Sequence, residues 1–250
     1  MISGYPMAPE VSFFNRLVGH LAATRPVEAK IVSLPSFPID RARRHLAKRV
    51  LSWHPDYVVV QFGTTDAGAV LQRYLIKRLG IGKKSLTERG LSALSNRPGP
   101  WRAATFADMA RWFVKGAIAR LLRVPPRTSR EIYCQSASAI ASEIMASGAR
   151  PLLLTPFCFG DAWSEHYAKQ FSEDLEQLAR TKRFLVVNGL KALRKYPHRK
   201  VLLANGCHLS SFGHEVIAKE LLRVIMESSG VGVSGSDHGV VGETDCGNAR

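Results

Sequence analysis

The sequence predicts an α/β protein in which a doubly wound, mainly parallel β-sheet lies between two layers of helices. Apolar runs of strand length alternate along the chain with segments of helical period. The run PDYVVVQFG, Pro55–Gly63, is continuously apolar, as expected for a strand that is covered on both faces. The chain has 250 residues, which suffices for one full-sized core.

The expected elements follow in the order strand, helix, strand, helix. Strands are predicted at Glu28–Leu34 and Pro55–Gly63, with a helical segment at Asp40–His54 between them. We expect a sheet of about five parallel strands. The later elements are a helix at Arg130–Gly148, a strand at Ala149–Phe157, a helix at Ser164–Lys182, a strand at Phe184–Gly189 and a helix at Gly213–Ser229.

A single domain is expected over residues 1–227. Residues 70–130 form a basic helical insertion within it, and the glycine-rich, polar residues 228–250 form a flexible tail. Loops that follow parallel strands meet at one edge of a sheet, and ligands bind there. We therefore expect the insertion to lie outside the sheet and to cover the site.

The positive charge is concentrated in the insertion. The chain has a net charge of +15, and residues 70–130 hold fourteen Lys and Arg against only Glu88 and Asp108. Such a surface attracts anionic membranes or acidic polysaccharides, whereas nucleic acid is not expected because no aromatic nucleic-acid platform or phosphate loop is present. Alternatively, the charge belongs to a solvated face without a partner.

The segment Ala110–Val124 combines both kinds of side chain within the insertion. Its aromatic and aliphatic residues alternate with arginine and lysine at helical spacing. A basic amphipathic helix of this kind can lie on an anionic membrane. The alternative is a helix that packs on the sheet and turns its cationic residues toward water.

The composition favours a cytoplasmic protein. No run of 18 apolar residues and no secretory signal pattern are found in the sequence, and its four cysteines lack C-x-x-C spacing. A disulfide framework or a structural zinc site is therefore not expected. A peripheral position on the inner membrane is the alternative location.

Two stretches carry motifs of a known hydrolase family. In WHPDYVVVQFGTTDAG, the predicted strand is followed by Gly63 and Asp66, with Thr65 at a position where the family has asparagine. In NGCHLSSFGHEVIAKEL, Asn205 stands where the family has aspartate. The residues that match in this second stretch are His208, Leu209, Ser210, Gly213 and His214.

These blocks and the strand SGARPLLLTPF between them resemble the SGNH hydrolases, also called GDSL-type esterases, over most of residues 1–227. The resemblance implies a three-layer, flavodoxin-like α/β/α fold and acyl-transfer chemistry without a metal or organic cofactor. In that family a serine attacks an ester carbonyl and a histidine removes its proton. Hydrogen-bond donors hold the oxyanion that forms. Acylated saccharides or lipids are the expected substrates.

The first block of the family, G-D-S, would fall at the start of the chain. If Gly4 takes the glycine position, Pro6 takes that of the serine, and proline has neither hydroxyl nor amide hydrogen. Ser3 is therefore the candidate nucleophile, or else an ordinary exposed serine. Both registers imply a clipped first strand, so we expect either a true start upstream or a remnant of the site.

The resemblance also assigns the remaining site positions. Ser36 falls near the glycine of the second block, and Gly63 and Thr65 complete the candidates for the oxyanion or substrate site. His208 is the candidate base and Asn205 the residue that orients it, unless His208 is a structural loop histidine. In a serine-protease triad the equivalent Asp-to-Asn change lowers the rate about 10,000-fold.

Two further residues have two interpretations each, and a third has one. Cys207 is either a thiolate nucleophile or a buried, inert thiol. Asp66 either orients a loop or caps a helix, and capping is favoured. His214 is expected to be structural, at the start of the last helix.

Two functions of different classes follow. The first is a weak or divergent SGNH-like esterase or acyl-transfer enzyme that acts on an acylated saccharide or lipid. The second is a catalytically inactive SGNH-like domain that binds carbohydrate or an anionic partner, since fold alone does not fix function.

Overall fold

A parallel β-sheet forms the centre of the structure, which is a computed structural model that describes residues 9–32, 34, 37–68, 71–79, 102–157 and 159–229. Within these residues the sheet has three strands in the order β1-β2-β3. The strands are β1 (Tyr57–Gln61), β2 (Arg150–Leu154) and β3 (Leu185–Val187). Val59, Leu152 and Leu185 stand in register across them.

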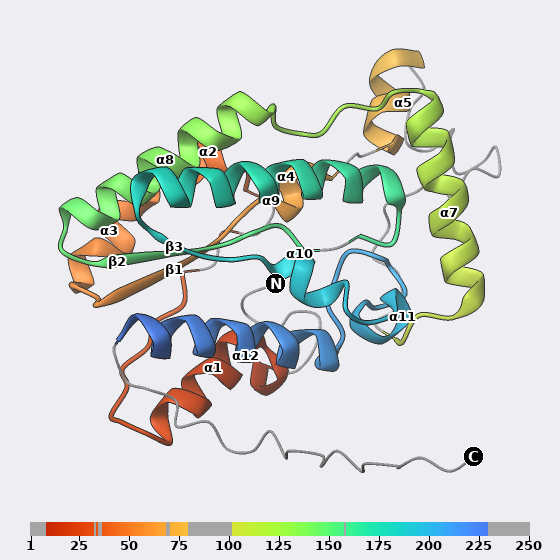
Figure 1. Ribbon diagram of the computed structural model, residues 1–250. Coiled ribbons are helices and arrows are strands. Elements are labelled where there is room, and N and C mark those ends of the chain that lie inside the picture. The colour runs from red at the N-terminus through yellow and green to blue at the C-terminus, as the bar shows by residue number, and fades with distance from the viewer. Residues whose placement is uncertain are drawn as a thin grey trace, which may run out of the picture.

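Two pairs of long helices cover the two faces of the sheet (Figure 1). On one face lie α8 (Arg130–Ala146) and α9 (Ala162–Lys182), and on the other lie α1 (Phe13–Ala22) and α12 (Ser211–Ser228). Each begins at a side-chain oxygen that accepts a backbone N–H, as a capping residue does. The caps are Ser129, Asp161, Ser12 and Ser210. The predicted three-layer α/β/α class is thereby confirmed.

The helix α7 (Phe106–Leu121) stands beyond the carboxyl ends of the strands, next to the first turn of α9 (Figure 1). Shorter elements connect the layers. They are η1 (Pro9–Val11), α2 (Ile39–Ala42), η2 (Arg43–His45), α3 (Leu46–Arg49), η3 (Leu51–Trp53), α4 (Thr64–Ala67), α5 (Leu71–Leu79), α10 (Gly189–Leu193) and α11 (His198–Val201).

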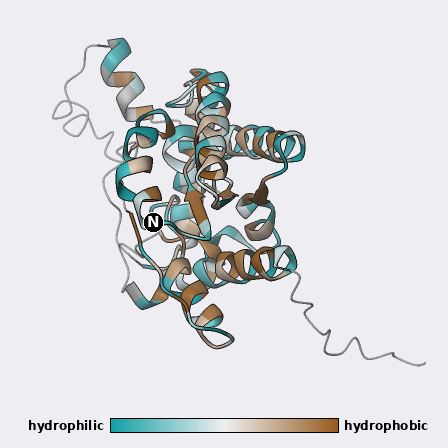
Figure 2. Cartoon of the chain, turned by 90° about the vertical axis from the view of Figure 1, so that its left-hand side faces the viewer, coloured by the Kyte–Doolittle hydropathy of each residue, from teal (hydrophilic) through white to brown (hydrophobic). Residues whose placement is uncertain are grey.

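The apolar core lies on both sides of the sheet. Figure 2 shows the apolar strands, in brown, between helices that carry both hydrophobic (brown) and hydrophilic (teal) residues. Leu152 of β2 is fully buried, as expected for the central strand. On one face the rings of Tyr133 and Phe171 stack with their centroids 4.4 Å apart. On the other face α12 contributes the buried Ile217 and Leu221. Among the described helices, none is long and apolar enough to pass through a bilayer.

The predicted strand at Glu28–Leu34 is wrong for the residues that the structure describes there. Residues 28–32 run as coil, and a cavity of about 930 Å³ lies between residues 25–32 and β1. Among the described residues β1 pairs only with β2, and the cavity separates the segment from β1. The described sheet therefore has three strands rather than the expected five or so.

The predicted domain boundaries are covered only in part. Within the insertion at 70–130, α5 and α7 lie outside the sheet, and residues 80–101 fall outside the described residues. The described chain ends at residue 229, so nearly all of the tail at 228–250 is outside it as well. The insertion as a unit and the tail remain predictions.

The carboxylate of Asp66 joins three separate segments at the end of β1. Its Oδ1 accepts hydrogen bonds from the Ile39 amide at 3.1 Å and from the Thr128 hydroxyl at 2.6 Å. Its Oδ2 accepts the Gly63 amide at 3.1 Å, which caps α4 as we had favoured. Burial raises the pKa of Asp66, and these donors act against that shift. A fully buried carboxylate thus holds the starts of α2, α4 and α8 together.

We predict that Asp66→Ala destabilises the fold by about 3 kcal/mol or more, because it leaves two buried amides and a hydroxyl without their acceptor. Chemical denaturation would measure the loss. The matched control is Asp40→Ala, which removes a nearby exposed carboxylate and should change stability by less than about 0.5 kcal/mol. Equal effects of the two substitutions would contradict the role assigned to Asp66.

Candidate functional site

The loop between α11 and α12 lies at the end of the sheet where the strands finish (Figure 1). His208 belongs to this loop. The loop is closed by an antiparallel bridge between Leu202 and Leu209, both fully buried. The Leu203 amide also donates to the His208 carbonyl at 2.9 Å. The two ends of this loop are therefore anchored in the core, and the residues between Leu202 and Leu209 are held in place.

The Asn205 side chain is hydrogen-bonded to its neighbours inside this loop. Its Oδ1 accepts the backbone amides of Cys207 and His208, each at 3.1 Å. Its Nδ2 lies 2.8 Å from Nδ1 of the His208 ring. Because two backbone N–H groups hold the amide oxygen, only Nδ2 is left to face the ring. Asn205 therefore contacts the His208 ring through its nitrogen, and its role in orienting that ring stays a prediction.

The orientation of the Asn205 amide bears on where the imidazole carries its hydrogen. If Asn205 Nδ2 donates to Nδ1 of His208, the neutral ring holds its hydrogen on Nε2. A general base needs the other tautomer, with a free electron pair on Nε2 and a hydrogen on Nδ1 that an acceptor holds. With Asn205 as the donor to Nδ1, Nε2 would carry the hydrogen and could not act as that base.

Burial sets the ionisation of both loop side chains. It lowers the pKa of His208 to about 4, so the ring is neutral at pH 7. The Sγ atom of Cys207 lies 3.3 Å from His208 Nδ1. Burial raises the pKa of the Cys207 thiol to about 11, which keeps it protonated and favours the inert-thiol interpretation.

His214 is structural, as expected from its position. It is 1% exposed, and its Nδ1 accepts the backbone amide of Phe13 at 3.1 Å. Burial lowers its pKa to about 3, so it serves as a neutral acceptor. The first turns of α1 and α12 are thereby joined next to the His208 loop.

Trp112 of α7 supports the loop from behind, which we did not predict from the sequence. Its indole N–H donates to the Ala204 carbonyl at 3.2 Å. A Cβ added at Gly206 would lie 2.7 Å from the indole nitrogen, and Gly206 has φ +69°, so the close approach requires glycine. The loop therefore rests on an aromatic ring that belongs to the predicted insertion.

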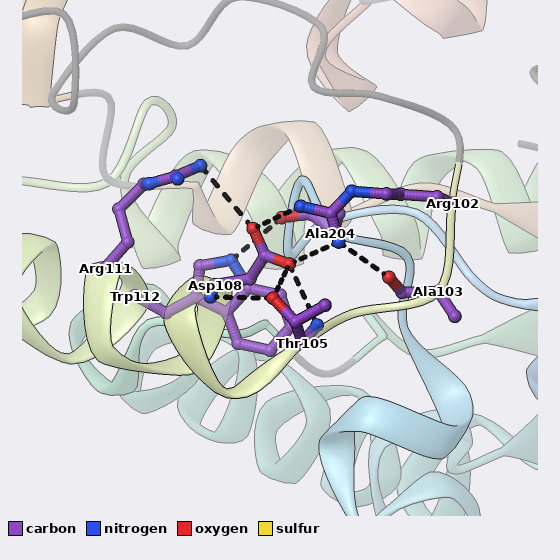
Figure 3. A network of polar contacts seen from close by, with 7 residues as sticks. All are labelled: Arg102, Ala103, Thr105, Asp108, Arg111, Trp112 and Ala204. Carbon is purple, nitrogen blue, oxygen red and sulfur yellow. Dashed lines mark hydrogen bonds and ion pairs between the residues drawn. The ribbon is translucent and has the colours of Figure 1, made fainter.

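A buried carboxylate fixes the start of α7 and with it Trp112 (Figure 3). Asp108 accepts two hydrogen bonds from the Arg102 guanidinium, at 2.7 and 3.1 Å, and bonds from the amide and hydroxyl of Thr105. Burial raises the pKa of Asp108, but these donors outweigh it and lower the pKa to about 2. The charge is therefore retained at all physiological pH values.

Gly63 and Thr65 lie at the end of β1, where sequence reasoning placed them. Gly63 has φ +103°, and a Cβ there would lie 2.5 Å from the Pro156 ring, so no other residue fits. Its amide is already bonded to Asp66. Thr65 is half-buried and lines the 930 Å³ cavity, which leaves it as the better candidate donor at this strand end.

The structure thus groups the predicted residues into two sets. His208 and Asn205 contact each other, while Gly63 and Thr65 share the end of β1 and the cavity. His208 and Asn205 are not among the lining residues of that cavity. Ser3, Gly4 and Ser36 fall outside the described residues, so their roles remain predictions. Within the described ranges no group of three or more His, Cys, Asp or Glu side chains could hold a metal ion.

Solved structures with the same arrangement of elements identify the scaffold. The acetylxylan esterase Axe2 from Geobacillus stearothermophilus matches with a TM-score of 0.56 and 17% identity, over 86% of this chain and 80% of that one. A protein described as lipolytic and of the G-D-S-L family, from Desulfitobacterium hafniense, matches with a TM-score of 0.57 and 16% identity, over 89% and 93%. The chain has the SGNH-hydrolase fold.

A third solved structure with a similar fold is an α/β hydrolase from the metagenome of Lake Arreo, Spain. It matches with a TM-score of 0.57 and 15% identity, over 86% of this chain and 81% of that one. No protein-family model and no curated protein matches the sequence. The SGNH-hydrolase fold is therefore shown by structure, and the roles of single side chains rest on the geometry described above.

We predict that Asn205→Asp reverses the tautomer of His208. A carboxylate would accept a hydrogen from Nδ1 and attract the imidazolium, so the pKa of His208 should rise from about 4 toward or above roughly 6.5. Nitrogen-15 NMR of the imidazole would follow both changes. A hydrogen that stays on Nε2, or an unchanged pKa, would show that Asn205 does not control the ring.

The two buried histidines also predict how stability depends on pH. Burial lowers the pKa of His208 to about 4 and that of His214 to about 3, below the roughly 6.5 of an unfolded histidine. The unfolded chain thus binds protons that the folded chain does not. Stability should fall as pH decreases from 7 to 5, by at most about 1.4 kcal/mol per pH unit for each ring.

Urea unfolding at several pH values would measure this dependence. The variant His208→Gln should lose about half of the slope, because only His214 would remain. A slope that is the same in both proteins would mean that His208 does not titrate differently in the folded chain.

Proposed function

We propose that the protein is a weak SGNH-like esterase or acyl-transfer enzyme that acts on an acylated saccharide or lipid. The observation that carries the proposal is His208, which a hydrogen bond from Asn205 orients in the loop before α12 of an SGNH-hydrolase fold. No step of this chemistry needs a metal or organic cofactor.

In the proposed reaction a hydroxyl, for which Ser3 is the candidate, attacks the ester carbonyl carbon. Its proton passes to Nε2 of His208, and the carbonyl electron pair moves onto oxygen, where Thr65 is a candidate donor. The carbon–oxygen bond then breaks, and the leaving alkoxide takes the proton from Nε2. Water repeats the sequence on the acyl-enzyme, or a second hydroxyl compound accepts the acyl group.

Asn205 is the reason we propose a slow reaction. To act as base, the His208 ring must carry its hydrogen on Nδ1, so Asn205 must turn its oxygen to the ring and release two backbone amides. Each hydrogen bond has a net value of about 1 kcal/mol, which makes the competent state rarer by roughly 30-fold. A neutral amide also stabilises the imidazolium less than a carboxylate does.

The structural neighbours support the substrate class. One is described as an acetylxylan esterase and another as a lipolytic protein, and both chemistries cleave an ester of a carboxylic acid. Variants of the acetylxylan esterase in which an aspartate or a serine is replaced by alanine are described as catalytic mutants. For this chain, an acylated saccharide or lipid is therefore the substrate class to test first.

One observation favours a second candidate function, a catalytically inactive domain that binds carbohydrate or an anionic partner. Asn205 Nδ2 faces Nδ1 of His208, and with Asn205 as donor Nε2 would also be a donor, which suits a saccharide oxygen or an anion rather than the hydroxyl of a nucleophile. The excess of positive charge at residues 70–130 fits the same kind of partner. In this case Asn205 holds a binding group in place.

An ester hydrolysis assay separates the two candidates. We predict slow hydrolysis of a short-chain aryl ester and of an acetylated xylo-oligosaccharide by the unmodified protein. Asn205→Asp should raise kcat at least about tenfold, because it supplies the tautomer and the charge that a base needs. His208→Ala should remove the activity.

The matched control is His166→Ala, which replaces an exposed histidine of α9 and should leave the rate unchanged. Activity that survives His208→Ala would remove this histidine from the mechanism. A protein that hydrolyses neither ester, with or without Asn205→Asp, but binds the oligosaccharide through His208, would favour the second function.

A further inference from the structure

The helix α7 has apolar side chains on the side that faces solvent. Its inner side consists of Asp108, Trp112, Gly116 and Ala119, which are buried against α9 and the His208 loop. On the opposite side, Phe113 is 75% exposed and Leu121 is 82% exposed. The packed alternative placed the cationic residues toward water, and Arg111 and Arg120 are indeed exposed, but apolar side chains share that exposed side.

The exposed apolar residues form one continuous stripe. They recur at intervals of three, four and seven residues, which places them on a single side of a helix with 3.6 residues per turn. We call this set the outer stripe of α7. It consists of Phe106, Ala110, Phe113, Val114, Ala117 and Leu121, all exposed.

The outer stripe is where the exposed apolar surface of the described chain is concentrated. Of the seven large hydrophobic side chains that are exposed among the described residues, five lie between Phe106 and Leu122. The other two, Ile132 and Met145, lie on α8 and are more than three turns apart along it. Contiguous apolar patches on a protein surface mark sites of interaction, whereas scattered ones do not.

Positive charges lie along the outer stripe. Residues 102–127 contain six Lys and Arg against one carboxylate, Asp108. Asp108 and Asp161 pair with Arg102, Arg111 and Lys115. The described part of the chain offers no ion-pair partner to Arg120 or Arg123. The guanidinium of Arg199, from α11, lies 5.2 Å from the ring centre of Phe106.

We propose that the outer stripe of α7 binds the surface of a lipid bilayer that contains anionic lipids. Phe113, Leu121 and their neighbours would enter the boundary between headgroups and acyl chains, while Arg120 and Arg123 contact lipid phosphates. The helix would lie in the plane of the membrane and would not cross it. This proposal depends only on exposure and charge, and it is independent of the esterase proposal.

Charge and shape favour a bilayer over the other possible occupants. A second copy of this chain also carries a net charge of +15, so pairing of two stripes would bring like charges together. An acidic polysaccharide would neutralise Arg120 and Arg123 but would leave the phenylalanine and leucine side chains in water. An anionic bilayer satisfies both the charges and the apolar stripe.

Vesicle co-sedimentation tests the proposal, with vesicles of phosphatidylcholine that contain a minority of phosphatidylglycerol. The double variant Phe113→Gln/Leu121→Gln should bind at least about tenfold more weakly, because two apolar side chains no longer leave water. Arg120→Gln/Arg123→Gln should weaken binding at low salt, and vesicles of phosphatidylcholine alone should bind less of the unmodified protein. The four replaced side chains are all exposed, so circular dichroism should show an unchanged fold in both double variants.

The matched control is Ile132→Gln, which removes a 47% exposed apolar side chain from α8 and should leave vesicle binding unchanged. Three results would overturn the proposal. They are failure of the unmodified protein to bind anionic vesicles at low ionic strength, binding that Phe113→Gln/Leu121→Gln does not weaken, and a dimer in light scattering that this variant dissociates while vesicle binding is absent. Ester hydrolysis in solution is measured separately, so its loss or presence does not bear on these outcomes.

Discussion

One buried carboxylate determines how the loops at the end of β1 are arranged. Asp66 has no exposed surface, and its oxygens are held by two backbone amides and a hydroxyl from segments up to 62 residues away. Removing a carboxylate from water is unfavourable, so such a group is tolerated only where donors surround it. The start of α2, the turn at Gly63 and the entry to α8 must therefore take the positions that satisfy Asp66. The half-buried Thr65, the candidate donor, is held between residues that this carboxylate fixes.

A second constraint is the hydrogen bond between Asn205 and His208, which bears on where the imidazole carries its hydrogen. An aspartate beside a catalytic histidine accepts a hydrogen from Nδ1, whereas Asn205 donates one to it. The two side chains have nearly the same shape, so the loop, the ring position and the burial of His208 can all persist while the location of the hydrogen is reversed. The same amide also closes the turn by accepting the amides of Cys207 and His208. Asn205 thus stabilises the loop through its oxygen and faces the His208 ring with its nitrogen.

The sequence predicted those helices and strands whose formation depends on the residues of a single segment. The continuous apolar run around Val59 predicts β1, and apolar residues at helical spacing predict α8 and α12. Prediction failed at residues 28–32, because a strand needs a partner and the sequence does not show which segment pairs with which. It also could not tell which side of α7 faces inward, since Trp112 and Phe113 are adjacent and both aromatic. The support that Trp112 gives to Ala204 joins residues 92 positions apart, and the His208 tautomer depends on a hydrogen-bond direction, so neither follows from a pattern in the sequence.

The bond between the Phe13 amide and His214 joins residues 201 positions apart, and Arg16 and Glu215 form an ion pair beside it. On a ribosome, the first helix therefore emerges long before its partner has been synthesised. Until then its apolar side, with Phe13, Leu17 and Leu21, has no α12 to cover it. Such distant pairings form late and leave apolar surface open to chaperones and to aggregation during synthesis. Completion of α12 is thus the event that allows the amino-terminal layer to close.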